Sequence, residues 1–232
     1  MGSTTTPAKL SALSAQGIEP HLITPDHNSK DNSFFRTDTL IVAVPPRLRR
    51  QPPDSYLDQM RRAASAAREG GASHVIFISS TSVYPDLNRV MTEQDADEEH
   101  PLVMAEQFFL QEKAFSTSVI RFAGLVGPGR HPGRFLAGKT VSGGSDPVNI
   151  IHLDDCILII ERLMSKPGLI VNGCADLHPA KRVFYTQAAL SLNLAPPSFD
   201  NGHSRYKIVS NELLKNELDY NFVFPDPMTM TY

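Results

Sequence analysis

The stretch that decides the fold is His74-Val-Ile-Phe-Ile-Ser-Ser-Thr-Ser-Val-Tyr84. Its β-branched and aromatic residues favour a short buried strand, and hydroxyl side chains follow where that strand ends. Buried parallel strands have this pattern when their carboxyl ends open into a ligand crevice. The stretch therefore predicts a parallel strand over 75–79 with a binding site at its end.

Outward from this strand, apolar runs alternate with helical patterns. We expect strands at 39–44, 117–121, 148–152 and 169–172, with a weaker one at 19–24. Helices are expected between them, beginning near Asp54 or Ser55 and ending at Gly70-Gly71, then over 102–113, 154–164, 179–192 and 211–217. This alternation predicts an α/β fold with a doubly wound, mostly parallel sheet.

The composition is that of an ordinary soluble globular protein. The 232 residues carry a net charge of -3, which gives no electrostatic reason to expect nucleic acid or an anionic membrane as a partner. No long apolar run or basic-then-apolar leader occurs, so we expect a cytoplasmic protein without a membrane span. Cys156 and Cys174 are expected to be buried free thiols.

Three segments carry a resemblance to a known family. Ile78-Ser-Ser-Thr-Ser-Val-Tyr84 resembles the Ser-Ser-x-x-Val-Tyr strand end of the extended short-chain dehydrogenases/reductases, the NAD-dependent epimerase/dehydratase group. Val148-Asn-Ile-Ile-His-Leu-Asp-Asp155 is similar to that group's Ile-His-Val-Asp-Asp motif, and Arg121-Phe-Ala-Gly-Leu-Val-Gly-Pro-Gly129 to its Arg-x-x-x-x-x-Gly-Pro segment. The longer segment Gly127 to Thr140 narrows the resemblance to one bacterial branch of the family.

The resemblance implies a Rossmann-like fold over residues 1–232, with a small C-terminal substrate lobe interleaved in sequence, mainly 127–150 and 173–232. It also implies NAD or NADP as cofactor. The expected activity is that of an NAD(P)-dependent oxidoreductase or epimerase acting on a small, anionic, nucleotide-sugar-like ligand. A homodimer is the expected assembly.

Ser80 matches the family serine that hydrogen-bonds the reacting substrate oxygen. The family's catalytic tyrosine and lysine, a Tyr-x-x-x-Lys pair on the next helix, have no counterpart, because that helix contains no tyrosine and the pair occurs nowhere in the chain. Glu106 could act as acid or base in its place, although a glutamate on an amphipathic helix is more often solvated. Two alternatives therefore stay open: a serine-assisted enzyme, or a catalytically silent binding protein in which the serines only cap the strand end.

The cofactor side departs from the family at its start. The opening residues resemble the end of the family's second strand, so the Gly-x-Gly-x-x-Gly turn that contacts a pyrophosphate is missing. A start codon assigned too late, a truncated gene, or true loss of the first unit would each explain this. The resemblance assigns the cofactor to the opening residues and to the ends of the expected strands 39–44 and 75–79: Ser3, Thr4, Thr5, Pro45, Pro46 and Ser79.

A basic, glycine-jointed loop follows the Arg121 segment. Its arginine forks suit phosphate or carboxylate, and its place in the family implies the substrate side of the crevice. A solvated surface loop is the alternative. The residues assigned to substrate are Ser82, Arg130, His131, Arg134 and Lys139.

Two further patterns have competing explanations. Gly133-Arg-Phe-Leu-Ala-Gly-Lys-Thr140 satisfies the Walker A pattern of nucleotide-binding P-loops, which need a strand directly before them and a helix directly after. Prolines precede this segment and glycines follow it, which argues against a P-loop. His152, Asp154 and Asp155 are explained by a strand end and a helix N-cap at Asp154, so we assign no metal site.

Overall fold

The computed structural model describes residues 1–23, 33–46, 52–202 and 204–232. Its central feature is a four-stranded parallel sheet with the order β10-β6-β4-β3. The strands are β3 (Thr39–Val42), β4 (His74–Ser80), β6 (Ser116–Phe122) and β10 (Ile170–Gly173). Because the strands are parallel, all four carboxyl ends lie at one edge of the sheet, as the alternating pattern predicted.

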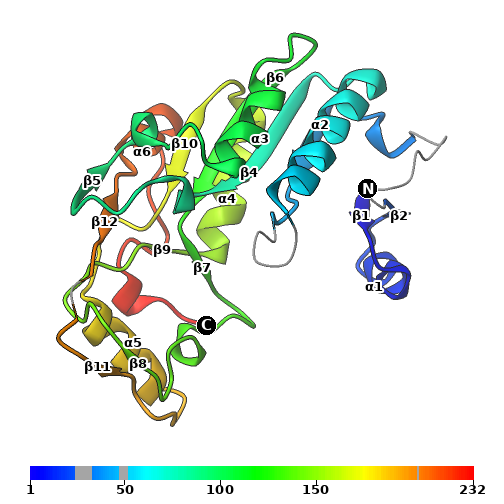
Figure 1. Cartoon of the computed structure of the whole chain (residues 1–232). Coiled ribbons are helices and arrows are strands. Elements are labelled where there is room, and N and C mark those ends of the chain that lie inside the picture. The colour runs from blue at the N-terminus through cyan, green and yellow to red at the C-terminus, as the bar shows by residue number, and fades with distance from the viewer. Residues whose placement is uncertain (24–32, 47–51, 203) are drawn as a thin grey trace.

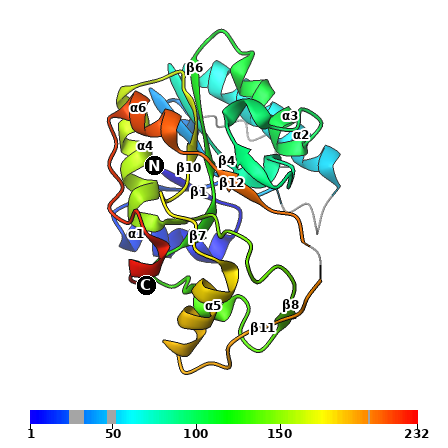
Figure 2. The same cartoon turned by 90° about the vertical axis from the view of Figure 1, so that its left-hand side faces the viewer.

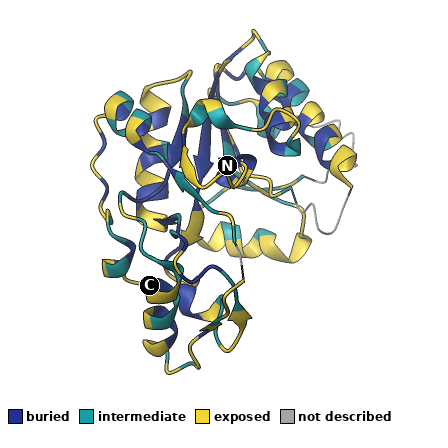
Figure 3. Cartoon of the chain, turned by 60° about the vertical axis from the view of Figure 1, so that its left-hand side comes forward, coloured by how far each residue is buried: buried dark blue, intermediate teal, exposed yellow. Residues whose placement is uncertain are grey.

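Helices cover both faces of this sheet, as Figure 2 shows. On one face lie α2 (Pro53–Gly70) and α3 (Pro101–Leu110), and on the other lies α4 (Leu153–Ser165). Phe77 faces α3, where its ring contacts Phe109 at 5.1 Å. The neighbouring residue Ile76 points the other way and is buried like Phe77, and Figure 3 colours the central strands mostly as buried. The doubly wound α/β prediction is confirmed.

The predicted helix ends differ from the observed ones in small ways. Gly71 ends α2 in the left-handed conformation (φ 82°), as expected. The helix begins at Pro53, one residue before Asp54, the earlier of the two expected starts. His152, and not Asp154, caps α4: its Nδ1 accepts a hydrogen bond from the backbone N–H of Asp154 at 3.2 Å. A histidine ring can accept at an N-cap just as a carboxylate does, and the sequence pattern does not separate the two.

A second hydrophobic cluster lies at the end of the molecule drawn lowest in Figure 1. Its buried members are Val126, Val148, Ile150, Ala175, Phe184 and Met230. Phe184 belongs to α5 (Lys181–Leu190), and Val126 and Ile150 belong to the paired strands β7 (Gly124–Val126) and β9 (Ile150–His152). A further parallel pair consists of β8 (Thr140–Val141) and β11 (Ser198–Phe199).

The remaining C-terminal elements pack on the main core instead. They are β12 (Lys207–Val209), which pairs with β5 (Arg89–Met91), and α6 (Glu212–Leu218). Val209, Leu214 and Tyr220 all belong to the main hydrophobic cluster. The division of 127–150 and 173–232 into a separate lobe stays a prediction.

At the N-terminus, β1 (Gly2–Thr4) and β2 (Pro20–Leu22) form a separate two-stranded parallel sheet joined by α1 (Leu10–Ala15). Figure 1 draws this unit apart from the four-stranded sheet. The expected strand at 19–24 is β2, with Thr24 outside the described residues. Helix α1 was not predicted.

Two predictions from composition can be compared with the described residues. Both cysteines are buried and unpaired, and burial raises the pKa of each thiol to about 12, which confirms them as inert interior thiols. Within the described part of the chain, every helix is too short or too polar to cross a bilayer.

Candidate functional site

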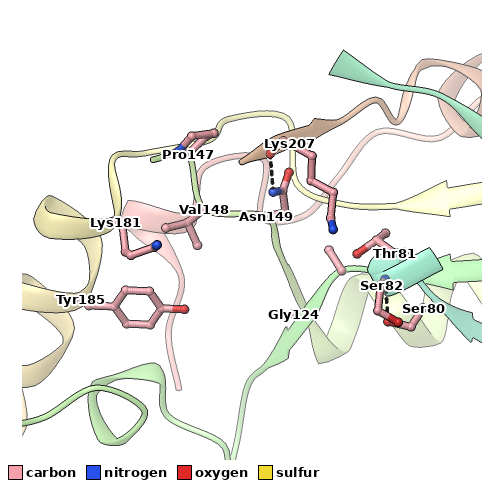
Figure 4. A pocket seen from close by; sticks show the side chains of 11 residues that line it. Ser80, Thr81, Ser82, Gly124, Pro147, Val148, Asn149, Lys181, Tyr185 and Lys207 are labelled. Carbon is pink, nitrogen blue, oxygen red and sulfur yellow. Dashed lines mark hydrogen bonds between the residues drawn. The ribbon is translucent and has the colours of Figure 1, made fainter. Parts of the chain in front are cut away.

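A cavity of about 350 Å³ opens where β4 ends, at the carboxyl edge of the sheet (Figure 4). Five parts of the chain meet there: the turn after β4, the start of β7, the loop before β9, α5 and β12. Their lining residues are Ser80, Thr81, Ser82, Ala123, Gly124, Pro147, Val148, Asn149, Lys181, Tyr185 and Lys207. We call this the Ser80 cavity.

The strand's alternation separates the two consecutive serines at its end. Ser80 reaches the cavity, and its Oγ accepts a hydrogen bond from the backbone N–H of Ser82 at 3.1 Å, so it caps the short helix η3 (Thr81–Val83). The Ser80 hydroxyl proton remains available to a ligand oxygen. Ser82 is exposed and also lines the cavity. The capping geometry and a ligand-binding role are therefore both present at Ser80.

Two lysines line the cavity, and each ammonium already has a carboxylate partner. Lys181 Nζ donates to Asp146 Oδ2 at 3.0 Å and to the carbonyl of Ser142 at 3.4 Å. An ammonium has three N–H groups, so one remains for a ligand. The positive charge of Lys181 is compensated by Asp146, while its hydrogen-bonding capacity is not exhausted.

Lys207, on β12, is likewise held by one backbone carbonyl and one aspartate. Its Nζ donates to the carbonyl of Tyr84 at 2.7 Å and lies 2.9 Å from Asp86 Oδ1. Asn149 fixes the backbone beside it, because its amide donates to the carbonyl of Lys207 and accepts from the N–H of Val209, both at 2.9 Å. The cavity thus offers N–H donors in an environment without a net local charge.

Tyr185 completes the polar lining from α5. Its ring packs edge-on against Phe184 with a centroid distance of 5.0 Å, and burial raises the pKa of its phenol. Among the described residues, none is hydrogen-bonded to its hydroxyl. In Figure 4 this hydroxyl points from α5 into the space in front of the Ser80 turn.

Ser79, which precedes the cavity residue Ser80, belongs to a buried network of polar side chains. Its hydroxyl donates to Glu106 Oε1 at 2.5 Å, and the same carboxylate accepts from Arg121 Nε at 3.1 Å and Nη2 at 2.6 Å. Glu106 is 0% exposed and Arg121 4%. The interpretation of Glu106 as a solvated residue is wrong, because α3 turns it inward onto the arginine at the end of β6.

The network continues along the same face of the sheet to its edge strand, β10. Arg121 Nη1 donates to the hydroxyl of Tyr84 at 3.0 Å, and that hydroxyl donates to Asn172 Oδ1 at 2.6 Å. The backbone N–H of Asn172 donates to Glu93 Oε1 at 2.9 Å. Tyr84 is therefore a buried structural residue that does not line the cavity.

The residues assigned to the cofactor do not line the Ser80 cavity. Ser3 and Thr4 belong to β1, and Thr4 Oγ1 accepts from the N–H of Thr6 at 3.1 Å. Thr5 follows β1, and Pro45 and Pro46 follow β3. Ser79 has its hydroxyl committed to Glu106. Their cofactor-binding roles stay predictions.

The basic loop also lies outside the cavity lining. Arg130 donates to the carbonyl of Leu125 at 2.8 Å, and His131 caps the short helix η5 (Pro132–Arg134) while its ring packs against Tyr232 at 4.5 Å. Arg134 is exposed, and Lys139 donates to the carbonyl of Phe135 at 2.8 Å. Substrate contacts from these four residues stay predictions.

The Walker-like segment lacks the structural context of a P-loop. Its first glycine lies in η5, and β8 follows it instead of a helix. A Cβ at Gly133 would lie 2.1 Å from the carbonyl oxygen of Ala188 on α5. Close packing of η5 on α5 therefore explains this glycine without a phosphate.

The comparisons with known proteins agree with this geometry. Protein YeeZ of Escherichia coli K12 is 35% identical over 243 residues, an alignment that covers 99% of this chain and 89% of YeeZ. The chain belongs to the YeeZ family. No protein-family model matches the sequence.

Solved structures similar to this YeeZ-family protein establish its fold. A functionally unknown conserved protein from Silicibacter pomeroyi has a TM-score of 0.74 at 24% identity and covers 98% of this chain and 86% of its own. The Helicobacter pylori ADP-L-glycero-D-manno-heptose-6-epimerase reaches 0.76 at 14% identity, with 95% and 79% covered. MoeE5, solved with UDP-glucuronic acid and NAD, reaches 0.69 at 18% identity, with 93% and 89% covered. The fold is the Rossmann-like fold of the short-chain dehydrogenase and epimerase superfamily.

The described residues of this YeeZ-family protein fit only part of a dinucleotide site. The crevice beside Ser80 offers hydroxyl and N–H donors for a ligand. The sequence has no Gly-x-Gly-x-x-Gly turn, and the backbone N–H groups that cradle a pyrophosphate normally come from such a turn. The described residues therefore include no turn of this kind, and no reaction step through a dinucleotide follows from them.

Sequence reasoning missed Lys181, Tyr185 and Lys207. Their place in the cavity depends on how α5 and β12 pack beside the loop 147–149, which involves contacts distant in sequence. The available signal was the spacing of Lys181 and Tyr185, which puts both side chains on one face of the expected helix.

Proposed function

We propose that the protein is an NAD(P)-dependent oxidoreductase- or epimerase-like protein that binds a small ligand of the nucleotide-sugar type in the Ser80 cavity. The observation that carries this proposal is the cavity itself. It lies at the carboxyl ends of parallel strands, where ligands bind in open α/β sheets, and it gathers hydroxyl, phenol and ammonium donors.

The two lysines that line the cavity are each paired with an aspartate, and this pairing limits which chemical groups of a ligand the cavity favours. Lys181 and Lys207 each retain one N–H, while Asp146 and Asp86 compensate their charges. Such a site suits the hydroxyl and carbonyl oxygens of a sugar better than a bare phosphate, because there is no uncompensated positive charge to attract one. The ligand's anionic part would then lie outside the cavity.

Isothermal titration calorimetry of the full chain with UDP-glucose and UDP-glucuronic acid tests the ligand class. We expect binding, weakened about threefold to tenfold by Ser80→Ala, since one hydrogen bond contributes about 0.5–1.5 kcal/mol. Ser65→Ala, on α2 and outside the cavity lining, is the matched control and should bind like the wild type. Wild-type protein that binds neither sugar nucleotide would reject the proposed ligand class.

The coenzyme is tested separately by titrating NAD and NADP into the same protein. NAD and UDP-glucuronic acid are present together in the similar MoeE5 structure, and that likeness supports the cofactor part of the proposal. The absence of any heat or thermal shift with either dinucleotide would reject the cofactor and leave the ligand site standing.

A catalytically silent binding protein is the second candidate. It is favoured by two observations: α3 has no tyrosine, and Ser80 is hydrogen-bonded only to the backbone of η3 among the described residues. A serine without an acid or base partner is a poor proton donor or acceptor at neutral pH. Sugar-nucleotide binding with no absorbance change at 340 nm and no new sugar nucleotide detected by chromatography, in the presence of NAD or NADP, would favour this candidate.

A further inference from the structure

Lys181 and Tyr185 lie on one face of α5 and both line the Ser80 cavity. Residues four apart on a helix are neighbours on its surface. Figure 4 shows both side chains pointing from α5 towards the turn that carries Ser80. The cavity therefore has hydroxyls on two walls, the strand end of β4 and the helix α5.

The ring of Tyr185 is fixed while its hydroxyl is unused. The ring packs on the second hydrophobic cluster and edge-on against Phe184. A tyrosine hydroxyl in such partly buried surroundings normally has a hydrogen-bond partner, yet the described residues provide none. A held ring with an unused hydroxyl that faces a cavity is the arrangement expected of a ligand contact.

Lys181 anchors the same helix face to the cavity floor. Its ammonium is held by Asp146 and the carbonyl of Ser142, which fixes the start of α5 beside the loop before β9. Burial also raises the pKa of the Tyr185 phenol, so the phenol keeps its proton at neutral pH. Tyr185 can then donate a hydrogen bond but cannot act as a base.

We propose that Tyr185 is a second hydroxyl donor of the site, which hydrogen-bonds the ligand from α5 while Ser80 does so from the turn after β4. The inference rests on the proposed function, because the ligand is the sugar nucleotide proposed there. It assigns α5 the phenol that α3 lacks.

The test uses full-length protein labelled with ¹³C at Cζ of tyrosine, which gives one resonance for each of the six tyrosines. Tyr185→Phe identifies the Tyr185 resonance by its loss, and circular dichroism checks that this variant folds. We expect this resonance to move when saturating UDP-glucose or UDP-glucuronic acid is added. The resonance of Tyr206, which does not line the cavity, should stay in place.

The affinities complete the test. Tyr185→Phe should weaken sugar-nucleotide binding about threefold to tenfold, in line with the loss of one hydrogen bond, while Tyr206→Phe should not. Because the two donors lie on different walls, the losses of the Ser80→Ala, Tyr185→Phe double variant should be close to additive in free energy. A stationary Tyr185 resonance or an unchanged Tyr185→Phe affinity, in protein that binds the probe, overturns this inference alone. Wild-type protein that binds neither probe overturns the proposed ligand class and this inference with it.

Discussion

Ser79 and Ser80 are adjacent on β4, yet their side chains enter opposite environments. Ser79 donates into a buried carboxylate–guanidinium network, whereas Ser80 opens into the Ser80 cavity. The difference follows from the two-residue alternation of a strand. One strand end therefore contributes to stability through one face and to ligand binding through the other. Mutations on the first face should lower the free energy of unfolding, and mutations on the second should lower the ligand affinity.

The largest expected effect comes from removing the charge of Glu106, the carboxylate that Ser79 contacts on the buried face. Glu106→Gln leaves the guanidinium of Arg121 buried without its counter-charge, and we expect a loss of about 3–5 kcal/mol in the free energy of unfolding. Urea denaturation measures it. Glu112→Gln, which breaks the exposed pair with Arg68, is the control and should cost less than about 1 kcal/mol. Equal losses in the two variants would contradict a structural role for the buried network.

Ser79→Ala is the next largest effect and tests the network side of the strand end. It removes a hydrogen bond to a charged, fully buried acceptor, so we expect a loss of about 1.5–3 kcal/mol in unfolding free energy. The intact cavity lining should leave sugar-nucleotide affinity within about twofold of the wild type in calorimetry. A selective loss of affinity with unchanged stability would place Ser79 on the ligand side instead.

Ser80→Ala is the opposite test on the neighbouring residue. Only a local cap on η3 is lost, and we expect unfolding free energy to fall by about 0.5–1 kcal/mol. Ser79→Ala should thus lose mainly stability and keep its ligand affinity, whereas Ser80→Ala should lose ligand affinity and keep most of its stability. Urea denaturation and calorimetry on both proteins decide it, and similar profiles would show that the two faces do not divide the roles.

The smallest effect concerns pH and the other end of β4. His74 is buried, with Nε2 3.0 Å from Ser118 Oγ, and burial lowers its pKa below the usual 6.5. The unfolded chain then binds the proton more readily, so the stability from neutral His74 is present above the ordinary histidine pKa and is lost as pH falls through it.

We therefore expect His74→Gln to lose less stability than the wild type between about pH 7 and about pH 5. Urea unfolding at the two pH values measures the difference. Parallel pH dependence in the two proteins would show that His74 does not contribute to it.

The sequence was sufficient to predict the strands and helices of the main sheet. The runs around Val75 and Val119 are apolar and β-branched, and glycine ends α2, so local signals and the observed structure agree. The N-terminal helix α1 was missed because its six residues are too few to display a helical period and none of them is buried. Short helices are formed by tertiary packing more than by propensity.

The candidate site was predictable only in part. Ser80 and Ser82 could be placed because they follow a strand directly. Glu106 was misread because its partner Arg121 is on another element, and Tyr185 was missed because its cavity forms only after α5 packs beside the turn after β4. The basic loop was singled out by its charge, and charge alone does not show where a side chain is held. The guanidinium of Arg130 donates to the carbonyl of Leu125, five residues earlier in the chain.

The network behind Ser79 also has a consequence for how the chain folds. Tyr84 and Asn172, which it joins, are 88 residues apart in sequence, so their bond can form only after β4, β6 and β10 are aligned. Parallel pairings of this range are slow to form. We expect the network to close late, so that Glu106→Gln accelerates unfolding and leaves the refolding rate almost unchanged.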